Sequence, residues 1–569
     1  MQTDILSSRH AAVRHNTASA LLSTFAHRGV TRAFGIPGGL VSPVFDALRA
    51  EPRIRLLSAR HETMAGYAAM GHAVVTGTPA LVVVTGGPGL TNAITAVAAA
   101  YLEGLPLIVI AGDVPSSASG RMALQDSSTS GIDTVAMLRT VTRWSARVDG
   151  PAAAIGIAEQ ALRIACGERP GPVFLSLPLD VGNQTTVPCP IALDCALGPA
   201  EPDQAACKEV AERLLCARRP LLVLGNGARG AAAELRHLAE RLACPVVTTP
   251  HAKGVFPESH RLHLGGLGIG GHPSVDEYLH APPDVVCIVG SRLGDYATNG
   301  WAQRLTGTDA TYQIDREPLF IGRNYPVTLG IVADSARAVA TITSHLPQDV
   351  ATPVRDFRGV RRHDESALVD DSVPLRPARI LRALQEAFPD AFWTVDQGEH
   401  CAYALHYLQV DHPDELRTLV GFAAMGSGIG LALGAASTQR GRPVIALCGD
   451  GGFVMHAGEI LSAVEQGLEL VLVVMNDGRW NMVHHGFQAV FGRRPDALPS
   501  KVSDIAGVAE SFGARGVAIE SPEQLRPEYL RALRTPGRPL LLDVRFDSST
   551  ALSTLSRSAS LRDFAERGA

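Results

Sequence analysis

Short apolar runs alternate with helix-like stretches along most of this chain. Runs of Val, Leu and Ile at residues 80–85, 105–111 and 173–178 predict buried strands, and alanine-rich stretches between them predict helices. The same alternation returns at 220–225 and 285–289. Strands that alternate with helices predict parallel sheets with helices on both faces.

Two polar segments interrupt this alternation. Residues 189–204 are rich in proline, cysteine and acidic side chains, and residues 349–373 are rich in charge. We therefore predict an α/β protein of three doubly wound parallel-sheet domains, and we expect the first and third to share an architecture. The predicted domains are 11–188, 205–346 and 375–548. A length of 569 residues agrees with three to four domains.

Composition excludes several classes of function. Hydrophobic residues make up 46% of the chain, charged residues 19%, and the net charge is −5, so nothing favours binding to nucleic acid or to an anionic membrane. No run of 18 apolar residues predicts a membrane span, and the first residues lack the apolar core of a signal peptide. The nine cysteines form no C-x-x-C pair, which predicts reduced thiols and a cytoplasmic protein.

A glycine-rich turn carries the first candidate chemistry. The apolar run 443–448 leads into Gly449-Asp450-Gly451-Gly452, and a second buried strand ends at Asn476-Asp477. A β-α-β crossover returns Asp477 beside Asp450, at the edge where open α/β sheets bind ligands. Two carboxylates at such a turn suit Mg²⁺ that also holds phosphate oxygens, and the glycines permit close backbone approach to the anion. The alternative is an ordinary turn with a solvated aspartate.

This segment resembles the diphosphate-binding motif of thiamine-diphosphate (ThDP) enzymes, GDG followed some two dozen residues later by NN. Asp477 stands where the second Asn is usual, and it remains a competent oxygen ligand. The resemblance implies a metal held at Asp450, Asp477 and Arg479. The implied cofactor contacts in this region are Gly449, Gly451, Gly452, Trp480, Asn481 and Met482.

A second block near the N-terminus strengthens the resemblance. It comprises the motifs Phe34-Gly-Ile-Pro-Gly-Gly39, Arg60-His-Glu62, Gly86-Gly-Pro-Gly-Leu-Thr-Asn92 and Tyr101 to Asp113. In order and spacing they resemble the pyrimidine-binding domain of the acetolactate synthase branch of ThDP enzymes. The implied cofactor contacts here are Pro37, Gly38, Glu62, Pro88 and Asn92.

Glu62 is the central residue of this block. In the family that the chain resembles, a carboxyl group hydrogen-bonds N1′ of the aminopyrimidine and so promotes removal of the thiazolium C2 proton. That role needs a poorly solvated carboxyl, because burial raises its pKa and strengthens the hydrogen bond. The alternative is that Glu62 merely occupies a favourable position at the start of a helix.

Further residues match the family's site. Met425 resembles the apolar residue over which the cofactor bends, a proximity effect that favours proton transfer; it can equally fill the core. Gln125 matches an active-site glutamine near the reacting carbonyl, with a solvated loop amide as the alternative. The diphosphate-contacting turn and its surroundings add Gly398, Glu399, His400 and Ala423.

The chain departs from the family after the metal motif. Biosynthetic acetolactate synthases read Met-Val-x-Gln-Trp, in which the Trp selects 2-oxobutyrate as acceptor. This chain reads Met482-Val-His484-His485-Gly486. We expect Gly486 to leave room for a different acceptor, and His484 and His485 to act as acid/base or carboxylate-binding groups. Either histidine can instead be a surface residue.

The central domain is less informative. Biosynthetic members of the family bind FAD there, and Gly225-Asn-Gly227, Gly290-Ser-Arg292 and Gln313-Ile-Asp315 lie at similar places. The family's Phe-Asp-Asp-Arg segment, however, is Leu293-Gly-Asp-Tyr296 here. Because glycines after strands are common as plain tight turns, FAD is possible but not favoured.

The resemblance implies a ThDP- and Mg²⁺-dependent carboligase of acetolactate-synthase type. It decarboxylates a 2-oxo acid, most simply pyruvate, and transfers the acyl carbanion equivalent to an acceptor carbonyl. The alternative enzyme is a non-ligating 2-oxo acid decarboxylase that releases an aldehyde. A non-catalytic homologue is disfavoured because Glu62 and Asp450 are both present. The family also implies a homodimer or homotetramer with active sites between chains.

Overall fold

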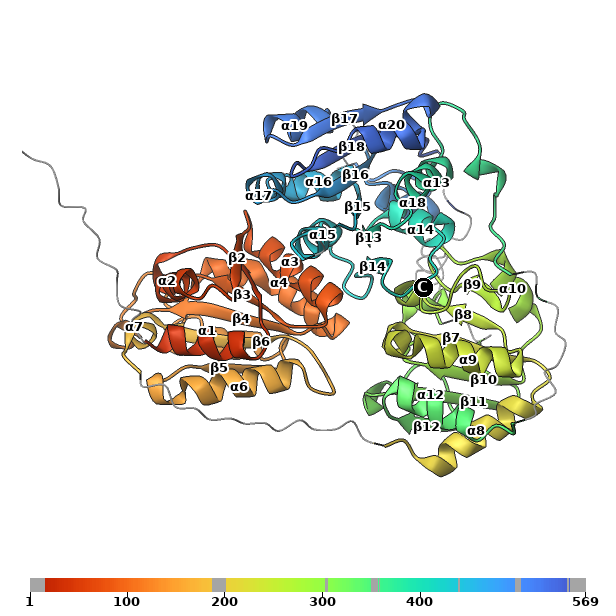
Figure 1. Ribbon diagram of the computed structural model, residues 1–569, viewed down its shortest axis with the longest axis horizontal. Coiled ribbons are helices and arrows are strands. Elements are labelled where there is room, and N and C mark those ends of the chain that lie inside the picture. Colours follow the sequence, from red (N-terminus) through yellow and green to blue (C-terminus); the bar gives the residue numbers. More distant parts are fainter. Residues whose placement is uncertain are drawn as a thin grey trace, which may run out of the picture. The chain divides into compact units, whose positions relative to one another are not determined.

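The computed structural model describes residues 16–186, 201–301, 305–348, 357, 359–438, 441–496, 503–549 and 552. The chain divides into two compact units, Met1–Ala196 and Leu197–Ala569, which are described separately below. The first unit contains one parallel sheet and the second contains two, each of six strands (Figure 1).

The sheet of the first unit has the strand order β2-β1-β3-β4-β6-β5, with all pairs parallel. One hydrophobic cluster on this sheet includes buried side chains of α1, α2, α6 and α7. Helices α3 and α4 pack against each other, and α3 also contacts β1 and β3. The strands are β1 (Arg32–Gly35), β2 (Arg55–Ser58), β3 (Ala80–Val84), β4 (Leu107–Asp113), β5 (Trp144–Arg147) and β6 (Val173–Pro178). The helices are α1 (Thr17–His27), α2 (Ser42–Ala50), α3 (Glu62–Thr76), α4 (Pro88–Glu103), α5 (Thr134–Leu138), α6 (Ala154–Ala165) and α7 (Leu179–Asn183).

The central sheet belongs to the second unit and has the order β12-β11-β10-β7-β8-β9. Its strands are β7 (Pro220–Leu224), β8 (Val246–Thr248), β9 (His263–Gly266), β10 (Val285–Val289), β11 (Ala310–Asp315) and β12 (Leu329–Val332). Its helices are α8 (Gln204–Cys216), α9 (Ala232–Leu242), α10 (Pro273–His280), α11 (Asp295–Thr298) and α12 (Ser335–Ser344). Two hydrophobic clusters, one of them built around α8, α9 and α12, show that the sheet is covered on both faces.

The C-terminal sheet has the order β14-β13-β15-β16-β18-β17, again wholly parallel. Its strands are β13 (Phe392–Val395), β14 (Leu416–Thr418), β15 (Val444–Gly449), β16 (Leu470–Asn476), β17 (Arg515–Ile519) and β18 (Leu540–Arg545). Its helices are α13 (Pro377–Ala387), α14 (Glu399–Tyr407), α15 (Ser427–Ala436), α16 (Asp450–His456), α17 (Glu459–Glu465), α18 (Asn481–Phe491), α19 (Ile505–Ser511) and α20 (Pro527–Ala532).

These three sheets confirm the predicted α/β class, and the first and third share one strand order, as expected. The central strands are buried along their whole length, which is why they appear in the sequence as continuous apolar runs. The domain boundaries stay predictions, since residues 187–200 and most of 349–358 lie outside the described residues.

One local prediction is wrong. The sequence predicts a turn over Gly449–Gly452, but α16 begins directly at Asp450, with Gly449 as its N-cap. Gly451 and Gly452 are poor helix formers, and their burial in the sheet edge overrides that propensity. Asp450 therefore occupies the first turn of a helix, where a carboxylate is favourably placed.

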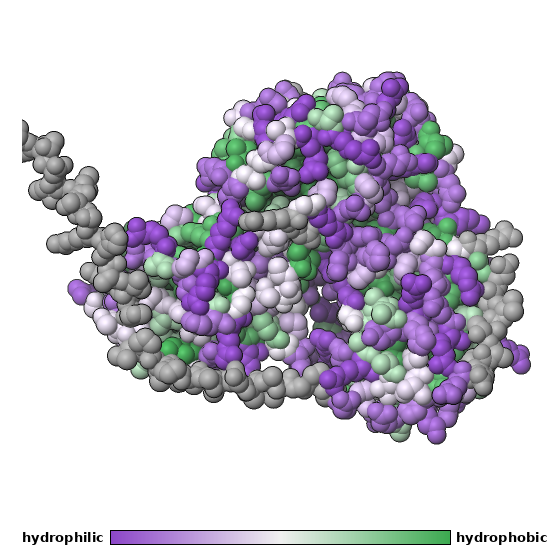
Figure 2. Space-filling view, viewed as in Figure 1, coloured by the Kyte–Doolittle hydropathy of each residue, from purple (hydrophilic) through white to green (hydrophobic). Residues whose placement is uncertain are grey.

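The described surface is mostly polar. The face in Figure 2 is largely hydrophilic, with apolar residues scattered singly or in small groups. No described helix is long and apolar enough to cross a membrane. The seven cysteines among the described residues are all free.

Candidate active site

In the first unit, Glu62 is the first residue of α3, at the carboxyl edge of the sheet. Its Oε2 accepts a hydrogen bond of 3.0 Å from Asn92 Nδ2 on α4. Thr63 Oγ1 donates a short hydrogen bond to the main-chain oxygen of Asn92, so the two helix starts are tied together. Within its own unit Glu62 is half-buried. The structure thus brings two of the predicted cofactor contacts together.

The chain packs tightly around this carboxylate. A Cβ on Gly38, the residue after Pro37, would lie 2.6 Å from Thr85 Cβ, and one on Gly89 would lie 2.8 Å from Thr85 Cγ2. That Cβ on Gly89 would also lie 3.4 Å from Glu62 Oε1. Pro88 is the first residue of α4, where its missing N–H costs nothing. Small residues here keep the edge of the sheet open.

Gln125 lies at the same edge of the sheet. Thr85 Oγ1 donates to Gln125 Oε1 at 3.3 Å, and Gln125 has a left-handed φ of 63°. Its loop is held by Ser127, whose Oγ accepts from Gly87 N at 2.8 Å and whose N–H donates to the buried Asp113 at 3.2 Å. Gln125 is half-buried, so it is not a freely solvated loop amide.

In the second unit, a cleft with about 880 Å³ of space, open solvent included, lies at the carboxyl edge of the C-terminal sheet. All the cofactor and metal residues predicted for this part of the chain line it: Gly398, Glu399, His400, Ala423, Met425, Gly449, Asp450, Gly451, Gly452, Asp477, Arg479, Trp480, Asn481 and Met482. The remaining lining residues are Ile269, Tyr296, Gln397, Cys401, Met475, Val483 and Phe546.

The two aspartates meet because β15 and β16 are neighbours, with Gly449 paired to Met475. Burial and the nearby Asp477 raise the pKa of Asp450 to about 6. Burial also raises the pKa of Asp477. Among the described residues, Asp477 Oδ2 and Asn481 Oδ1 are buried oxygens without a hydrogen-bond donor. Carboxylate and amide oxygens left open in this way suit a hard divalent cation.

The glycines of the cleft allow close contacts. A Cβ on Gly451 would lie 2.4 Å from Trp480 Nε1 and 3.0 Å from Met425 Cε, and one on Gly452 would lie 2.4 Å from Asp396 Oδ2. Any larger residue at either position would have to displace these atoms.

Asp396 is a residue that the sequence analysis missed. It is fully buried after β13 and accepts hydrogen bonds from Gly426 N at 2.8 Å and from Gly428 N at 3.0 Å. Burial raises its pKa to about 6. It therefore fixes the turn that follows Met425. A lone acidic residue at the end of an apolar strand was the available signal.

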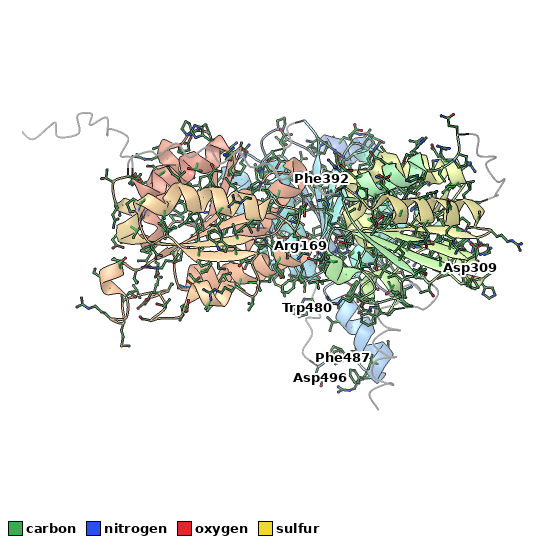
Figure 3. The ribbon with its side chains drawn as sticks, turned by 90° about the horizontal axis from the view of Figure 1, so that it is seen from below. Arg169, Asp309, Phe392, Trp480, Phe487 and Asp496 are labelled. Carbon is green, nitrogen blue, oxygen red and sulfur yellow. The ribbon has the colours of Figure 1, made fainter. Side chains whose placement is uncertain are left out.

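The two histidines of α18 lie in different surroundings. His485 Nδ1 is 2.9 Å from Glu399 Oε1, and the hydrogen bond to Glu399 raises the pKa of His485. His484 is buried, and burial lowers its pKa. Neither is a simple surface residue. Gly486 is buried one turn after the cleft-lining Met482. Figure 3 shows α18 running from Trp480 outward to Phe487, away from the C-terminal sheet.

Three family models cover most of the chain. They are the thiamine pyrophosphate enzyme N-terminal TPP binding domain at residues 15–137, the central domain at 207–342 and the C-terminal TPP binding domain at 396–544. The acetolactate synthase isozyme 1 large subunit of Escherichia coli is 30% identical over 94% of this chain and 94% of its own length. The acetolactate synthase large subunit of Corynebacterium glutamicum is 30% identical over 94% of this chain and 87% of its own.

The chain belongs to the acetolactate synthase family of thiamine pyrophosphate enzymes. Thiamine pyrophosphate is ThDP, so membership confirms the cofactor that the motifs predict. The residues of the cleft fit it: Gly451 and Gly452 line the cleft in the first turn of α16, where a helix N-terminus favours an anion, and the open oxygens of Asp477 and Asn481 fit the accompanying cation.

Two residues of the central domain also line the cleft of this family member. Ile269 N donates to the main-chain oxygen of Tyr296 at 2.9 Å, and both residues line the cleft. Tyr296 packs against the hydrophobic core of the C-terminal domain. The sequence analysis noted Tyr296 only as a departure from the family's FAD segment, and no local signal marks Ile269.

The glycines that suggested a nucleotide site in the central domain have another explanation. A Cβ on Gly225 would lie 2.2 Å from Gly290 O, and one on Gly290 would lie 2.4 Å from Ala228 N. Gln313 donates to the main-chain oxygens of Ser291 and Phe320. These turns pack against each other, which accounts for their glycines without a ligand.

Proposed function

We propose that this protein is a ThDP-dependent carboligase of acetolactate-synthase type. It decarboxylates a 2-oxo acid, pyruvate in the simplest case, and joins the resulting acyl unit to an acceptor carbonyl. The observation that carries the proposal is the convergence of Asp450, Asp477 and the Met425 turn on one cleft, in a chain of this family.

The C-terminal residues hold the cofactor in this proposal. Asp450 and Asp477 would hold Mg²⁺ through carboxylate oxygens, and the cation would compensate the charge of the diphosphate. A guanidinium cannot ligate a cation, so Arg479 contributes its main-chain carbonyl oxygen. Met425, whose Cε would lie 3.0 Å from a Cβ built on Gly451, would supply the apolar surface against which the cofactor packs.

Bound ThDP supplies the electron sink that makes loss of CO₂ from a 2-oxo acid possible. The residues of the first unit control protons and orientation. Glu62 shares a hydrogen bond with N1′ of the pyrimidine, and Asn92 Nδ2 keeps the carboxylate in place. Gln125, fixed by Thr85 and its left-handed backbone, orients the carbonyl of the substrate.

Selection of the acceptor falls to α18 in this proposal. Gly486 leaves space where other family members carry a Trp, and His484 and His485 provide groups that exchange protons or bind a carboxylate. The candidate that competes is a non-ligating decarboxylase, which would release an aldehyde.

Product analysis tests the proposal. The purified protein with ThDP, Mg²⁺ and carbon-13 pyruvate should form acetolactate or acetoin, followed by NMR, and a panel of 2-oxo acids and aldehydes should then identify the acceptor. Acetaldehyde as the sole product would support the decarboxylase, and absence of any ThDP-dependent CO₂ release would reject both functions.

We further propose a homodimer or homotetramer in which Glu62 of one chain and Asp450 of another serve the same cofactor, as a closed two-fold interface allows. Mixing Glu62→Gln and Asp450→Ala subunits tests this. Shared sites would recover up to about a quarter of wild-type activity, since half of random dimers are mixed and each has one intact site. Verified mixed dimers without activity would place each site within one chain.

Two further elements complete the proposal. FAD is possible but not favoured in the central domain; the mutual packing of the Gly225 and Gly290 turns supports this, and the visible absorption spectrum of the purified protein tests it. A cytoplasmic location is supported by the free cysteines among the described residues.

A further inference from the structure

Glu399 occupies an unusual place for a carboxyl group. It is the first residue of α14, only 4% exposed, and it lines the same cleft as Asp450 and Asp477. In the proposed function this cleft receives a diphosphate, and an ionised carboxylate facing a diphosphate is repelled by it. A proton on the side chain when the cofactor is bound would remove this repulsion.

The two oxygens of Glu399 differ. Oε1 lies 2.9 Å from Nδ1 of His485. Oε2 is buried without a well-formed hydrogen bond among the described residues, although the hydroxyl of Tyr403 is close enough to influence the carboxyl. An open, buried oxygen in the wall of a ligand cleft points to a partner on the ligand.

We propose that Glu399 is protonated at Oε2 in the cofactor-loaded enzyme and donates a hydrogen bond to a diphosphate oxygen, while His485 Nδ1 donates to Oε1. This inference rests on the proposed function. It makes His485 a positioning residue for the cofactor contact, and it makes cofactor binding take up a proton.

The charges around the pair agree with proton uptake. Burial and Asp477 raise the pKa of Glu399, whereas His485 and Tyr403 lower it. His485 is itself influenced by Asp477, Arg479 and His484. The N-terminus of α14 also favours an anion. Because these influences oppose one another, Glu399 can be ionised in the free protein. The negative charge of the bound diphosphate then favours its protonated form.

Calorimetry of cofactor binding tests the inference without any activity assay. Full-length protein, freed of cofactor by chelation and dialysis, is titrated with ThDP in excess Mg²⁺ at pH 6.5, 7.5 and 8.5. Buffers of different ionisation enthalpy report the protons taken up. We expect wild type to take up as much as one proton more than Glu399→Gln. Between pH 6.5 and 8.5, the Kd of wild type for ThDP should also rise about tenfold more than the Kd of Glu399→Gln, because binding that takes up a proton weakens as pH rises.

Two further variants sharpen the result. His485→Gln keeps a donor but removes the cationic neighbour, so proton uptake should persist and move to higher pH. Glu459→Gln changes another buried glutamate, 2% exposed and bound by Ser462 Oγ at 2.8 Å, and should match wild type. An infrared band of a protonated carboxyl should appear on cofactor binding in wild type and be absent from Glu399→Gln.

The outcomes separate the two levels of the argument. Wild-type protein that binds no ThDP would overturn the proposed function. Equal proton numbers in wild type and Glu399→Gln would overturn only this inference, as would an equal effect of Glu459→Gln. Loss of uptake in His485→Gln at all three pH values would place the proton on the imidazole and also overturn it.

Discussion

The first and third sheets have the same strand order but present different chemistry at their carboxyl edges. After the second strand, the first sheet presents Glu62, whereas the third presents Met425. After the third strand, the first sheet begins α4 with Pro88, whereas the third begins α16 with Asp450. Topology decides where side chains emerge, and the residue type at each exit decides whether the edge handles a proton or a metal.

The electrostatic surroundings differ as well. The third sheet places Asp450 beside Asp477, and burial and mutual repulsion raise the pKa of Asp450 to about 6. The first sheet places Glu62 with a neutral amide donor, Asn92. A pair of buried carboxylates calls for a cation, whereas a single carboxylate with a neutral neighbour can serve as a hydrogen-bonding partner of a base.

The largest effect expected from this comparison is at Glu62. Glu62→Gln should lower turnover by roughly 10²–10⁴-fold, the usual range for loss of acid–base function, while ThDP binding stays near wild type. Steady-state rates and exchange of the ThDP C2 proton measure the two parts. Glu168→Gln, an exposed glutamate of the same unit, is the control. Unchanged proton exchange in Glu62→Gln would remove Glu62 from this role.

The corresponding change in the third sheet should act on binding instead. Asp450→Asn removes one charge from the metal pair and should weaken Mg²⁺-dependent ThDP binding by about 100-fold or more, since even outer-shell changes at metal sites cost 10–100-fold. Titration of ThDP at fixed Mg²⁺ measures this. The exposed Asp414→Asn should bind normally. An Asp450→Asn variant with wild-type ThDP affinity but no turnover would contradict the proposal that the third sheet binds the metal while the first handles the proton.

A smaller effect is expected on α18, which follows the fourth strand of the third sheet, whereas the Gln125 loop follows the fourth strand of the first. Gly486→Trp should shift acceptor preference by roughly 1–3 kcal/mol toward small 2-oxo acids and leave decarboxylation of the donor nearly intact. Competition between paired acceptors measures it. Gln488→Trp places the same ring at an exposed position of the same helix. An identical acceptor profile in Gly486→Trp and wild type would locate the acceptor pocket elsewhere.

The smallest effect concerns stability at acid pH, where both units contain a buried histidine. Burial lowers the pKa of His72 in the first unit and of His406 in the second to about 4. The unfolded chain binds more protons than the folded one between about pH 4 and 6.5, so each histidine costs stability as pH falls through that window.

His406 gives the cleaner test because its ring is fully hydrogen-bonded when neutral. Nδ1 lies 3.0 Å from Gly271 O, and Nε2 accepts from His363 N at 3.1 Å. His406→Asn should reduce the loss of unfolding free energy between pH 6.5 and 5.5 by about 1 kcal/mol. Urea unfolding at the two pH values measures it, with His72→Asn as the comparison. An unaltered pH dependence in both variants would show that other groups carry the acid sensitivity.

Much of this molecule was predictable from local sequence. Strands such as β6 and β10 appear with the predicted bounds because buried parallel strands need continuous apolar runs. The turn predicted at Gly449–Gly452 is instead the start of α16, since burial at the sheet edge outweighs the low helix propensity of glycine. The roles of the site residues remain predictions until the experiments above are done.

The sequence by itself determined the α/β class, the family and the residues at the carboxyl edges, because periodicity and short motifs are local properties. Beyond the pair Asp450 and Asp477, only the tertiary structure decided which distant groups meet. It brought Asp396 to the turn after Met425, Tyr296 into the cleft, and His485 to Glu399 across 86 positions of chain. Such contacts depend on strand order and on the direction of each helix, and no local pattern encodes either one.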